Sequence, residues 1–143
     1  MTTATKVTLR WMIRRDVPDV VRFEADSPGG WDEAKILAFL KPSSNISFVA
    51  EAGGRVVAVC FYQLRADGIR LHRVAVDPGF RLRGVGRALV ARLQRTLQPG
   101  HRRRTIRAAV GEYALGSQLF LKKCGFTGSL REGKLRFVYR LKD

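Results

Sequence analysis

The chain has little cysteine, little acidic charge and no long apolar segment. Its 143 residues include only two cysteines, Cys60 and Cys124, and neither stands in a metal-ligand spacing. This predicts free thiols in a reducing cytoplasm, with no disulfide framework and no bound metal. No run of about 18 apolar residues occurs, so we expect no membrane span. The N-terminal residues lack the apolar core of a signal peptide.

Basic residues strongly outnumber acidic ones. Lysine and arginine total 27 against 12 aspartates and glutamates, a formal net charge of +15. One phosphorylated ligand needs less positive charge than this, so the excess favours an anionic partner such as ribosomal or other nucleic acid. The alternative is that these charges only keep the surface solvated. The densest cluster, at residues 101–104, has no interleaved aromatics. It is typical of a phosphate patch or a solvated turn rather than of a base-stacking platform.

What the sequence does contain is a succession of strand and helix patterns. A hydrophobic fraction of 45% over 143 residues suits one domain, residues 1–143. The element order β α α β β β α β α β β predicts a mixed α/β fold around one sheet. Asp16 is expected to cap the first helix, near Pro18. The expected strands are 6–13, 46–52, 55–64, 69–76, 105–110, 126–130 and 135–141, and the later helices are 32–40, 85–97 and 113–123.

The most informative stretch is a basic, glycine-containing turn between a strand and a helix. It reads Arg81-Leu82-Arg83-Gly84-Val85-Gly86-Arg87-Ala88, after the apolar run at 71–76. Glycines let a ligand approach the backbone, and the free N–H groups of a first helical turn attract anions. The stretch lacks the Gly-Lys-Ser/Thr of a Walker A loop and the third glycine of a dinucleotide fingerprint. It predicts a phosphate cradle of another kind.

This stretch resembles the acyl-CoA-binding motif of the GNAT N-acetyltransferases, and the resemblance extends over nearly the whole chain. Ser-Pro-Gly-Gly-Trp-Asp at 27–32 is similar to a turn of the RimI branch, which acetylates protein N-termini. Gln-Leu-Phe at 118–120 and Cys-Gly-Phe at 124–126 are similar to the family's late helix and its end. The resemblance implies a single domain with a twisted mixed sheet of about seven strands, flanked by about four helices.

The resemblance also implies a binding site for acetyl-CoA as cosubstrate. Val74, Ala75 and Val76 would hold the donor along its pantetheine arm, and the backbone N–H of Val76 would stabilise the oxyanion. The turn would hold the pyrophosphate through Arg81, Leu82, Arg83, Gly84, Val85, Gly86, Arg87 and Ala88.

The residues that usually perform the chemistry in RimI-type enzymes are replaced. Ala109, Ala114 and Leu121 stand where the family carries a glutamate base, an asparagine and a tyrosine acid. The sequence therefore leaves the catalytic residues unknown, and no general acid or base can be carried over from the family.

Three weak candidates for a replacement base remain, each with a structural alternative. Glu24 lies on the first predicted helix, where a surface or structural carboxylate is the competing interpretation. Glu112 follows a strand and can equally be a solvated carboxylate at a helix start. His72 lies on the central strand and can equally be a structural histidine. Tyr62 and Tyr113 are possible proton donors, but aromatic residues in such positions usually pack.

Two functions follow. The first is an N-acetyltransferase that moves acetyl from acetyl-CoA to an amine, in particular a protein N-terminal α-amine. An α-amine has a pKa near 8 against about 10.4 for lysine, so it needs less help from a base. The second is a catalytically weak or inactive CoA-binding module with a ribosome or RNA partner. A small-amine acceptor is a third option, although the charge of the chain disfavours cationic amines.

Overall fold

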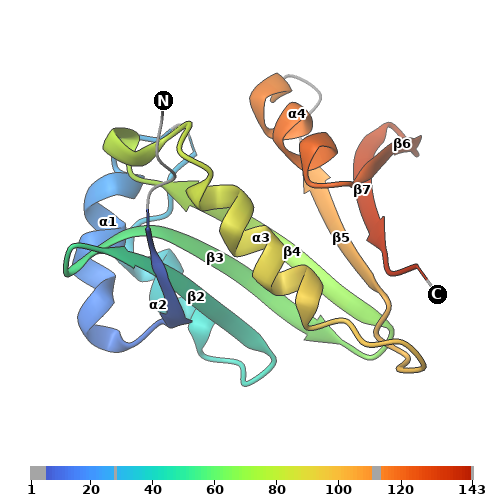
Figure 1. Ribbon diagram of the computed structural model, residues 1–143, viewed down its shortest axis with the longest axis horizontal. Coiled ribbons are helices and arrows are strands. Elements are labelled where there is room, and N and C mark those ends of the chain that lie inside the picture. Colours follow the sequence, from blue (N-terminus) through green and yellow to red (C-terminus); the bar gives the residue numbers. More distant parts are fainter. Residues whose placement is uncertain (1–5, 28, 111–113, 143) are drawn as a thin grey trace.

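Seven strands form one mixed sheet with helices on both faces (Figure 1). The computed structural model describes residues 6–27, 29–110 and 114–142. The spatial strand order is β1-β2-β3-β4-β5-β7-β6. The strands are β1 (Thr8–Trp11), β2 (Asn45–Ala52), β3 (Arg55–Arg65), β4 (Gly68–Val76), β5 (Thr105–Val110), β6 (Thr127–Arg131) and β7 (Lys134–Arg140), and the helices are α1 (Val17–Glu24), α2 (Glu33–Leu40), α3 (Val85–Arg95) and α4 (Leu115–Lys123).

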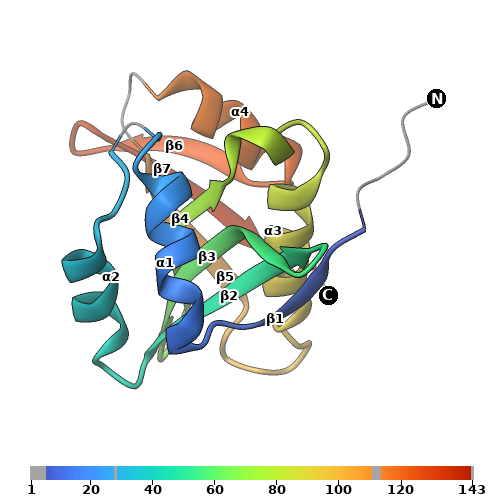
Figure 2. The same cartoon turned by 90° about the vertical axis from the view of Figure 1, so that its left-hand side faces the viewer.

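Two hydrophobic cores lie on opposite faces of the sheet. α1 and α2 cover one face, and α3 covers the other (Figure 2). The middle of β3 is buried on both faces, which accounts for its unbroken apolar run. Phe61 packs into the core under α1 and α2, while Leu89 and Leu93 of α3 pack into the second core with Phe137 of β7. The sheet is therefore covered on both faces around β3, where α1 and α2 pack on one side and α3 packs on the other.

β4 and β5 pair only over a short distance. They are parallel, with Ile69, Arg70 and Leu71 opposite residues 106–108, and beyond that they diverge (Figure 1). The divergence coincides with an irregularity in β4, because Phe61 of β3 lies opposite Arg73 while the next residue of β3 lies opposite Leu71. His72 is thus an extra residue on β4, and such a bulge redirects the side chains that follow it.

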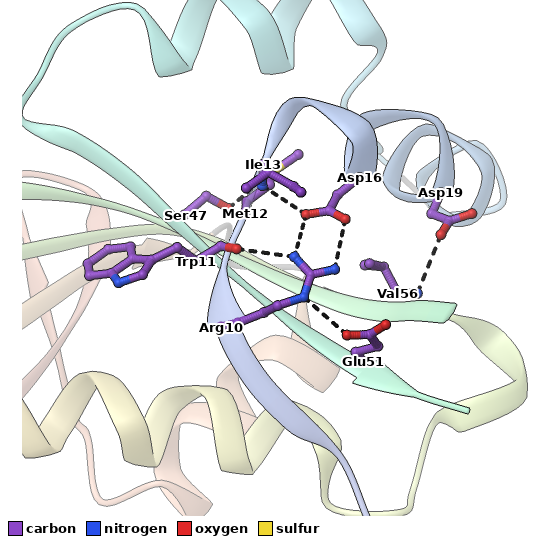
Figure 3. Close-up of polar contacts among 9 residues, drawn as sticks. All are labelled: Arg10, Trp11, Met12, Ile13, Asp16, Asp19, Ser47, Glu51 and Val56. Atoms are coloured by element: carbon purple, nitrogen blue, oxygen red, sulfur yellow. Dashed lines mark hydrogen bonds and ion pairs between the residues drawn. The ribbon is translucent and has the colours of Figure 1, made fainter. Parts of the chain in front are cut away.

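An ion-pair cluster ties β1 to the start of α1 (Figure 3). The Arg10 guanidinium donates to both carboxylate oxygens of Asp16, at 2.8 and 2.9 Å, and to Glu51 at 3.1 Å. Asp16 is buried and also accepts from the backbone N–H of Ile13 at 2.8 Å. Its pKa is lowered because these hydrogen bonds and the charges of Arg10 and Arg15 outweigh the opposing effect of burial.

The structure confirms the expected fold class and differs in details. Asp16 occupies the N-cap position of α1, but its side chain makes no capping bond because Arg10 and Ile13 engage it. The first strand is shorter than expected, and Trp11 on it is 55% exposed although it contacts Phe48. Among the described residues, no helix is both long and apolar enough to span a membrane.

Candidate functional site

The glycine turn leaves the start of α3 open. Gly84 is the N-cap of α3 with φ of +79°, and no side chain caps the helix there. The first intrahelical bond runs from the N–H of Ala88 to the carbonyl of Gly84, at 3.0 Å. The N–H groups of Val85, Gly86 and Arg87 precede that bond and have no intrahelical acceptor. A Cβ on Gly84 would meet nothing within 4 Å, so the backbone is accessible from outside.

Gly86 serves a different purpose from Gly84. A Cβ on Gly86 would lie 3.4 Å from the Val76 side chain and 3.4 Å from the Phe120 ring. These distances are at the short limit of ordinary van der Waals contact, so a Cβ fits only just, and a larger side chain would meet its neighbours. The absent side chain at this position lets the first turn of α3 approach β4 and α4 closely, whereas the glycine at 84 supplies the left-handed backbone.

The arginines of the turn are partly engaged by neighbouring groups. Arg81 donates to the carbonyl of Val76 at 3.3 Å and to the Ser27 hydroxyl at 3.1 Å. The Arg83 guanidinium lies 5.2 Å from the Phe80 ring centroid. Leu82 is fully exposed, with φ of +63°. All three arginines are exposed, but only Arg81 is hydrogen-bonded to the end of β4, through the carbonyl of Val76.

Backbone groups of β4 point into the gap between β4 and β5. The Asp77 N–H donates to the carbonyl of Val57 on β3, at 2.7 Å. Because hydrogen-bonding groups alternate along a strand, Val76 and Val74 direct theirs away from β3. The pairing with β5 has ended before this point. Ala75 instead directs its backbone groups to β3, and its side chain packs in the core under α1 and α2.

Glu24 forms a buried ion pair. It is 0% exposed, and both its oxygens accept from Arg73, at 2.5 and 2.8 Å. One of them also accepts from the Trp31 N–H at 3.0 Å. Trp31 in turn stacks on Phe61, with ring centroids 4.6 Å apart. The bulge at His72 places Arg73 on this face, and the pair fixes the α1–α2 turn to β4.

His72 lies at the point where β4 and β5 part, on the face of the sheet opposite α3. It is exposed, and its ring meets Phe39 of α2 edge-on at 5.0 Å. Its pKa is lowered below its usual value by partial desolvation and by the positive charges of Arg70 and Arg65. The lowered pKa favours the neutral imidazole, in which one ring nitrogen can accept a proton.

The C-terminal half of the sheet carries a long cavity on the face that α1 and α2 leave bare. This cavity, of about 630 Å³, extends over β4, β5, β7 and β6. We call it the arginine groove, because its lining contains Arg65, Arg70, Arg107, Arg131, Arg136 and Arg140. Sequence analysis missed it. The signal was the alternation of arginine with apolar residues in β5 and β7, which is equally typical of an ordinary solvated face.

The positions that differ from the usual catalytic set lie apart. Ala109 is on the floor of the arginine groove, one residue beyond Ala108, the partner of Leu71 on β4. Leu121 is buried in the α3 and α4 core, and Ala114 is the N-cap of α4. Tyr62 is buried, and desolvation raises its pKa. Glu112 and Tyr113 lie outside the described residues.

Part of the basic cluster at 101–104 has a structural role. Arg103 donates from its Nε to the carbonyl of Arg65 at 2.8 Å, and its backbone N–H donates to Nδ1 of His101 at 3.3 Å. Arg104 contacts the carbonyl of Leu141 at 3.4 Å. These bonds hold the loop between α3 and β5 against the end of the sheet.

Comparison with known proteins identifies the family. Residues 10–126 match the acetyltransferase (GNAT) family. The chain belongs to this family. The match runs from the last residues of β1 to just beyond α4, and so includes the glycine turn and the strand that precedes it. The RimI-like and GNAT resemblance expected from the sequence is thereby confirmed at the level of the superfamily.

Solved structures with the same fold include several GNAT enzymes. The ribosomal-protein-S18-alanine N-acetyltransferase of Escherichia coli has a TM-score of 0.74 at 18% identity, covering 95% of this chain and 93% of that one. An acetyltransferase from Thermus thermophilus has a TM-score of 0.80 at 18% identity, with 98% and 100% covered. The PaiA N-acetyltransferase of Thermoplasma acidophilum, in complex with coenzyme A, has a TM-score of 0.76 at 13% identity, with 95% and 99% covered. A search by sequence among curated proteins found no match.

Proposed function

We propose that the protein is an acetyl-CoA-dependent N-acetyltransferase that acts on the N-terminal α-amine of a polypeptide. The observation that carries this proposal is the pair of open backbone segments that meet where β4 and β5 part. One is the uncapped first turn of α3, and the other is the stretch of β4 from Val74 to Val76 that no strand pairs on the β5 side.

The residues of the turn fit a pyrophosphate and a pantetheine arm. The unbonded N–H groups of the first turn of α3 and the exposed Arg83 and Arg87 offer donors and positive charge to phosphate oxygens. Val74 offers its N–H and its carbonyl to the amides of the arm, and Val76 offers its carbonyl, which Arg81 shares. Acetyl-CoA, when bound, supplies the acetyl group as a thioester. The Val76 N–H is the proposed donor to the oxyanion.

We assign the proton acceptor to His72. Its lowered pKa favours the neutral imidazole, it lies at the parting of the strands, and it faces the side from which α3 is absent. His72 stands four residues before Val76 on β4, about 13 Å along an extended strand, so the proton of an amine attacking beside Val76 reaches the imidazole through bridging water molecules. Glu24 is a weaker candidate because both its oxygens are held by Arg73 in a buried pair.

An α-amine suits this base better than a lysine side chain does. A free α-amine has a pKa near 8, and about a tenth of it is neutral near pH 7. A lysine amine, with a pKa near 10.4, is neutral only to about one part in a few thousand. A histidine with a lowered pKa is a weak base. It can take a proton from an α-amine, but it has little driving force to take one from a lysine amine.

Donor binding is tested by thermal shift and by thiol release. Acetyl-CoA is expected to raise the melting temperature of the wild-type protein. Gly84→Val places a Cβ at a φ of +79°, in the space where phosphate would approach, and is expected to abolish that rise. Gly100→Val, at φ of +78° in a loop outside the turn, is the matched control for backbone strain. A rise that survives in the Gly84 variant contradicts the assignment of the turn.

The alternative function is a CoA-binding module without catalysis. Replacement of the usual glutamate and tyrosine by Ala109 and Leu121 favours it. It predicts a thermal shift with acetyl-CoA but no thiol release with any peptide, lysine or small-amine acceptor. Thiol release that requires an acceptor amine rejects this alternative.

A further inference from the structure

The arginines of the groove lack acidic partners. All six are exposed, and no ion pair joins any of them to an acidic side chain among the described residues. Arg70 on β4 lies directly opposite Arg107 on β5. Like charges that face each other across strands destabilise a sheet. The six arginines outnumber the two acidic residues of the lining, so the groove of the free protein carries an excess of positive charge, and a bound anion would relieve it.

The composition of the groove favours a peptide over a nucleic acid. Among its lining residues none is aromatic, so it offers no platform on which bases can stack. Its floor is small, with Gly68, Ala109 and Ser129, and leaves room for an extended backbone. The groove also contains two carboxylates, Asp67 and Glu132.

The two carboxylates lie at opposite ends of the groove. Asp67 precedes β4, at the end of the sheet where β4 and β5 begin. Glu132 is in the turn between β6 and β7, near the end of β5, because Leu135 of β7 pairs with Val110. This is also the end at which β4 and β5 part. A positively charged terminal amine approaching His72 would find a carboxylate there, and negative side chains behind it would find arginines.

The length of the groove fixes the size of the segment. From Thr105 to Ala109 β5 extends for about 13 Å, at about 3.3 Å per residue. An extended acceptor lying alongside would place about four residues over the arginines. The volume of about 630 Å³ is within the range of ligand-binding cavities.

We propose that the arginine groove binds the acidic residues that follow the terminal amine of the acceptor, so that the substrate is a polypeptide with an acidic N-terminal segment. This inference rests on the proposed acetyltransferase function for the reaction but not for the binding. Arg107 and Arg136, on the neighbouring strands β5 and β7, would form charge-assisted hydrogen bonds with the carboxylates of the substrate.

The test compares two peptides and two double variants. Both peptides begin with alanine; one continues with four acidic residues and the other with the corresponding amides, and each carries a fluorophore at its C-terminus. Arg107→Ser with Arg136→Ser removes two groove charges. Arg14→Ser with Arg55→Ser removes two exposed charges elsewhere and is the matched control. Peptide binding is measured by fluorescence anisotropy without acetyl-CoA, and thiol release is measured separately.

We expect the wild-type protein to bind the acidic peptide at least about tenfold more tightly than the amide peptide, and more weakly as salt rises. The groove variant should lose that preference, with KM raised and kcat at saturation retained, while the control variant keeps it. Equal affinity for the two peptides, or a preference that the groove variant retains, overturns the proposal. Tighter groove-dependent binding of a single-stranded RNA than of the acidic peptide overturns it in favour of a nucleic-acid partner.

The two assays distinguish failure of the proposed function from failure of the groove proposal. If no acceptor supports thiol release, the acetyltransferase assignment fails, and the anisotropy measurements alone decide the groove. If thiol release proceeds equally well with both peptides, the acetyltransferase assignment stands and the groove proposal is wrong.

Discussion

The two halves of the sheet differ in whether their charged side chains are paired. Under α1 and α2, each buried carboxylate has an arginine: Asp16 has Arg10, and Glu24 has Arg73. On the bare half, formed by the start of β4 with β5, β7 and β6, six arginines face solvent without an acidic partner among the described residues. A matched charge holds a structure together, whereas an unmatched cluster is available to a ligand. We therefore assign stability to the first half and acceptor binding to the second.

The largest effect is expected from breaking the matched half. Glu24→Ala should lower the free energy of unfolding by about 3 to 5 kcal/mol, because it leaves the charge of Arg73 without its partner. Urea denaturation measures the loss, and Asp26→Asn, an exposed carboxylate two residues on, is the control. Adding Arg73→Leu should recover part of the stability. An unchanged unfolding midpoint together with lost acetyl transfer would instead make Glu24 the base.

The next effect concerns the residue where the two halves meet. His72→Ala should lower kcat by about 100-fold or more, the usual contribution of a general base. His101→Ala, the other histidine of the chain, should leave kcat unchanged. Protonation of the acceptor α-amine should lower the wild-type rate gradually below about pH 8. Because the pKa of His72 is lowered from 6.5, the decline should steepen only below pH 6.5, as the imidazole is protonated, and this steeper part should be absent in the variant. A profile that declines only above neutrality contradicts this role.

A smaller effect separates the two glycines of the turn. Gly86→Val should lower the free energy of unfolding by about 1 to 3 kcal/mol, because the new side chain is forced against Val76 and Phe120. Thermal and urea denaturation without ligand measure this loss. Gly84→Val should lose donor binding in addition to the strain of its backbone. If the Gly86 variant is as stable as the wild-type protein, the close contact between α3 and β4 is not needed.

The smallest effect tests the unmatched half. Arg107→Ser should raise the free energy of unfolding by about 0.2 to 1 kcal/mol at low salt, because it removes repulsion from Arg70 across the β4–β5 pair. The gain should shrink as salt screens the charges. Denaturation at two salt concentrations measures it. A loss of stability would mean that Arg107 has a structural partner and that the groove is less available than we propose.

Sequence reasoning succeeded where the determinants are local. The glycine turn, the hairpin between β2 and β3 and the order of elements could be predicted, because periodicity and turn residues depend on near neighbours. The partnership of Glu24 with Arg73 could not, because it depends on a bulge at His72 that moves Arg73 to the other face of the sheet. The groove could not either, since Arg107 and Arg136 become neighbours only through the order in which β5 and β7 pair.

The position of the family's usual base lies in a different environment in this protein. RimI-type enzymes carry a glutamate where this chain has Ala109. In the structure Ala109 pairs with Arg136 and lies two residues beyond Arg107. A glutamate placed there would have its pKa lowered by these charges, which weakens it as a base. We therefore expect little gain in turnover from Ala109→Glu with Leu121→Tyr.

The central claim is that the protein transfers acetyl from acetyl-CoA to the N-terminal α-amine of an acidic polypeptide, with His72 as the proton acceptor. The most direct measurement is thiol release with isotope-labelled acetyl-CoA and the acidic peptide, followed by mass spectrometry to locate the label. The account predicts label on the terminal α-amine with wild-type protein, and a rate about 100-fold lower with His72→Ala. Binding of acetyl-CoA without transfer of label to any acceptor, or label on lysine side chains alone, would contradict it.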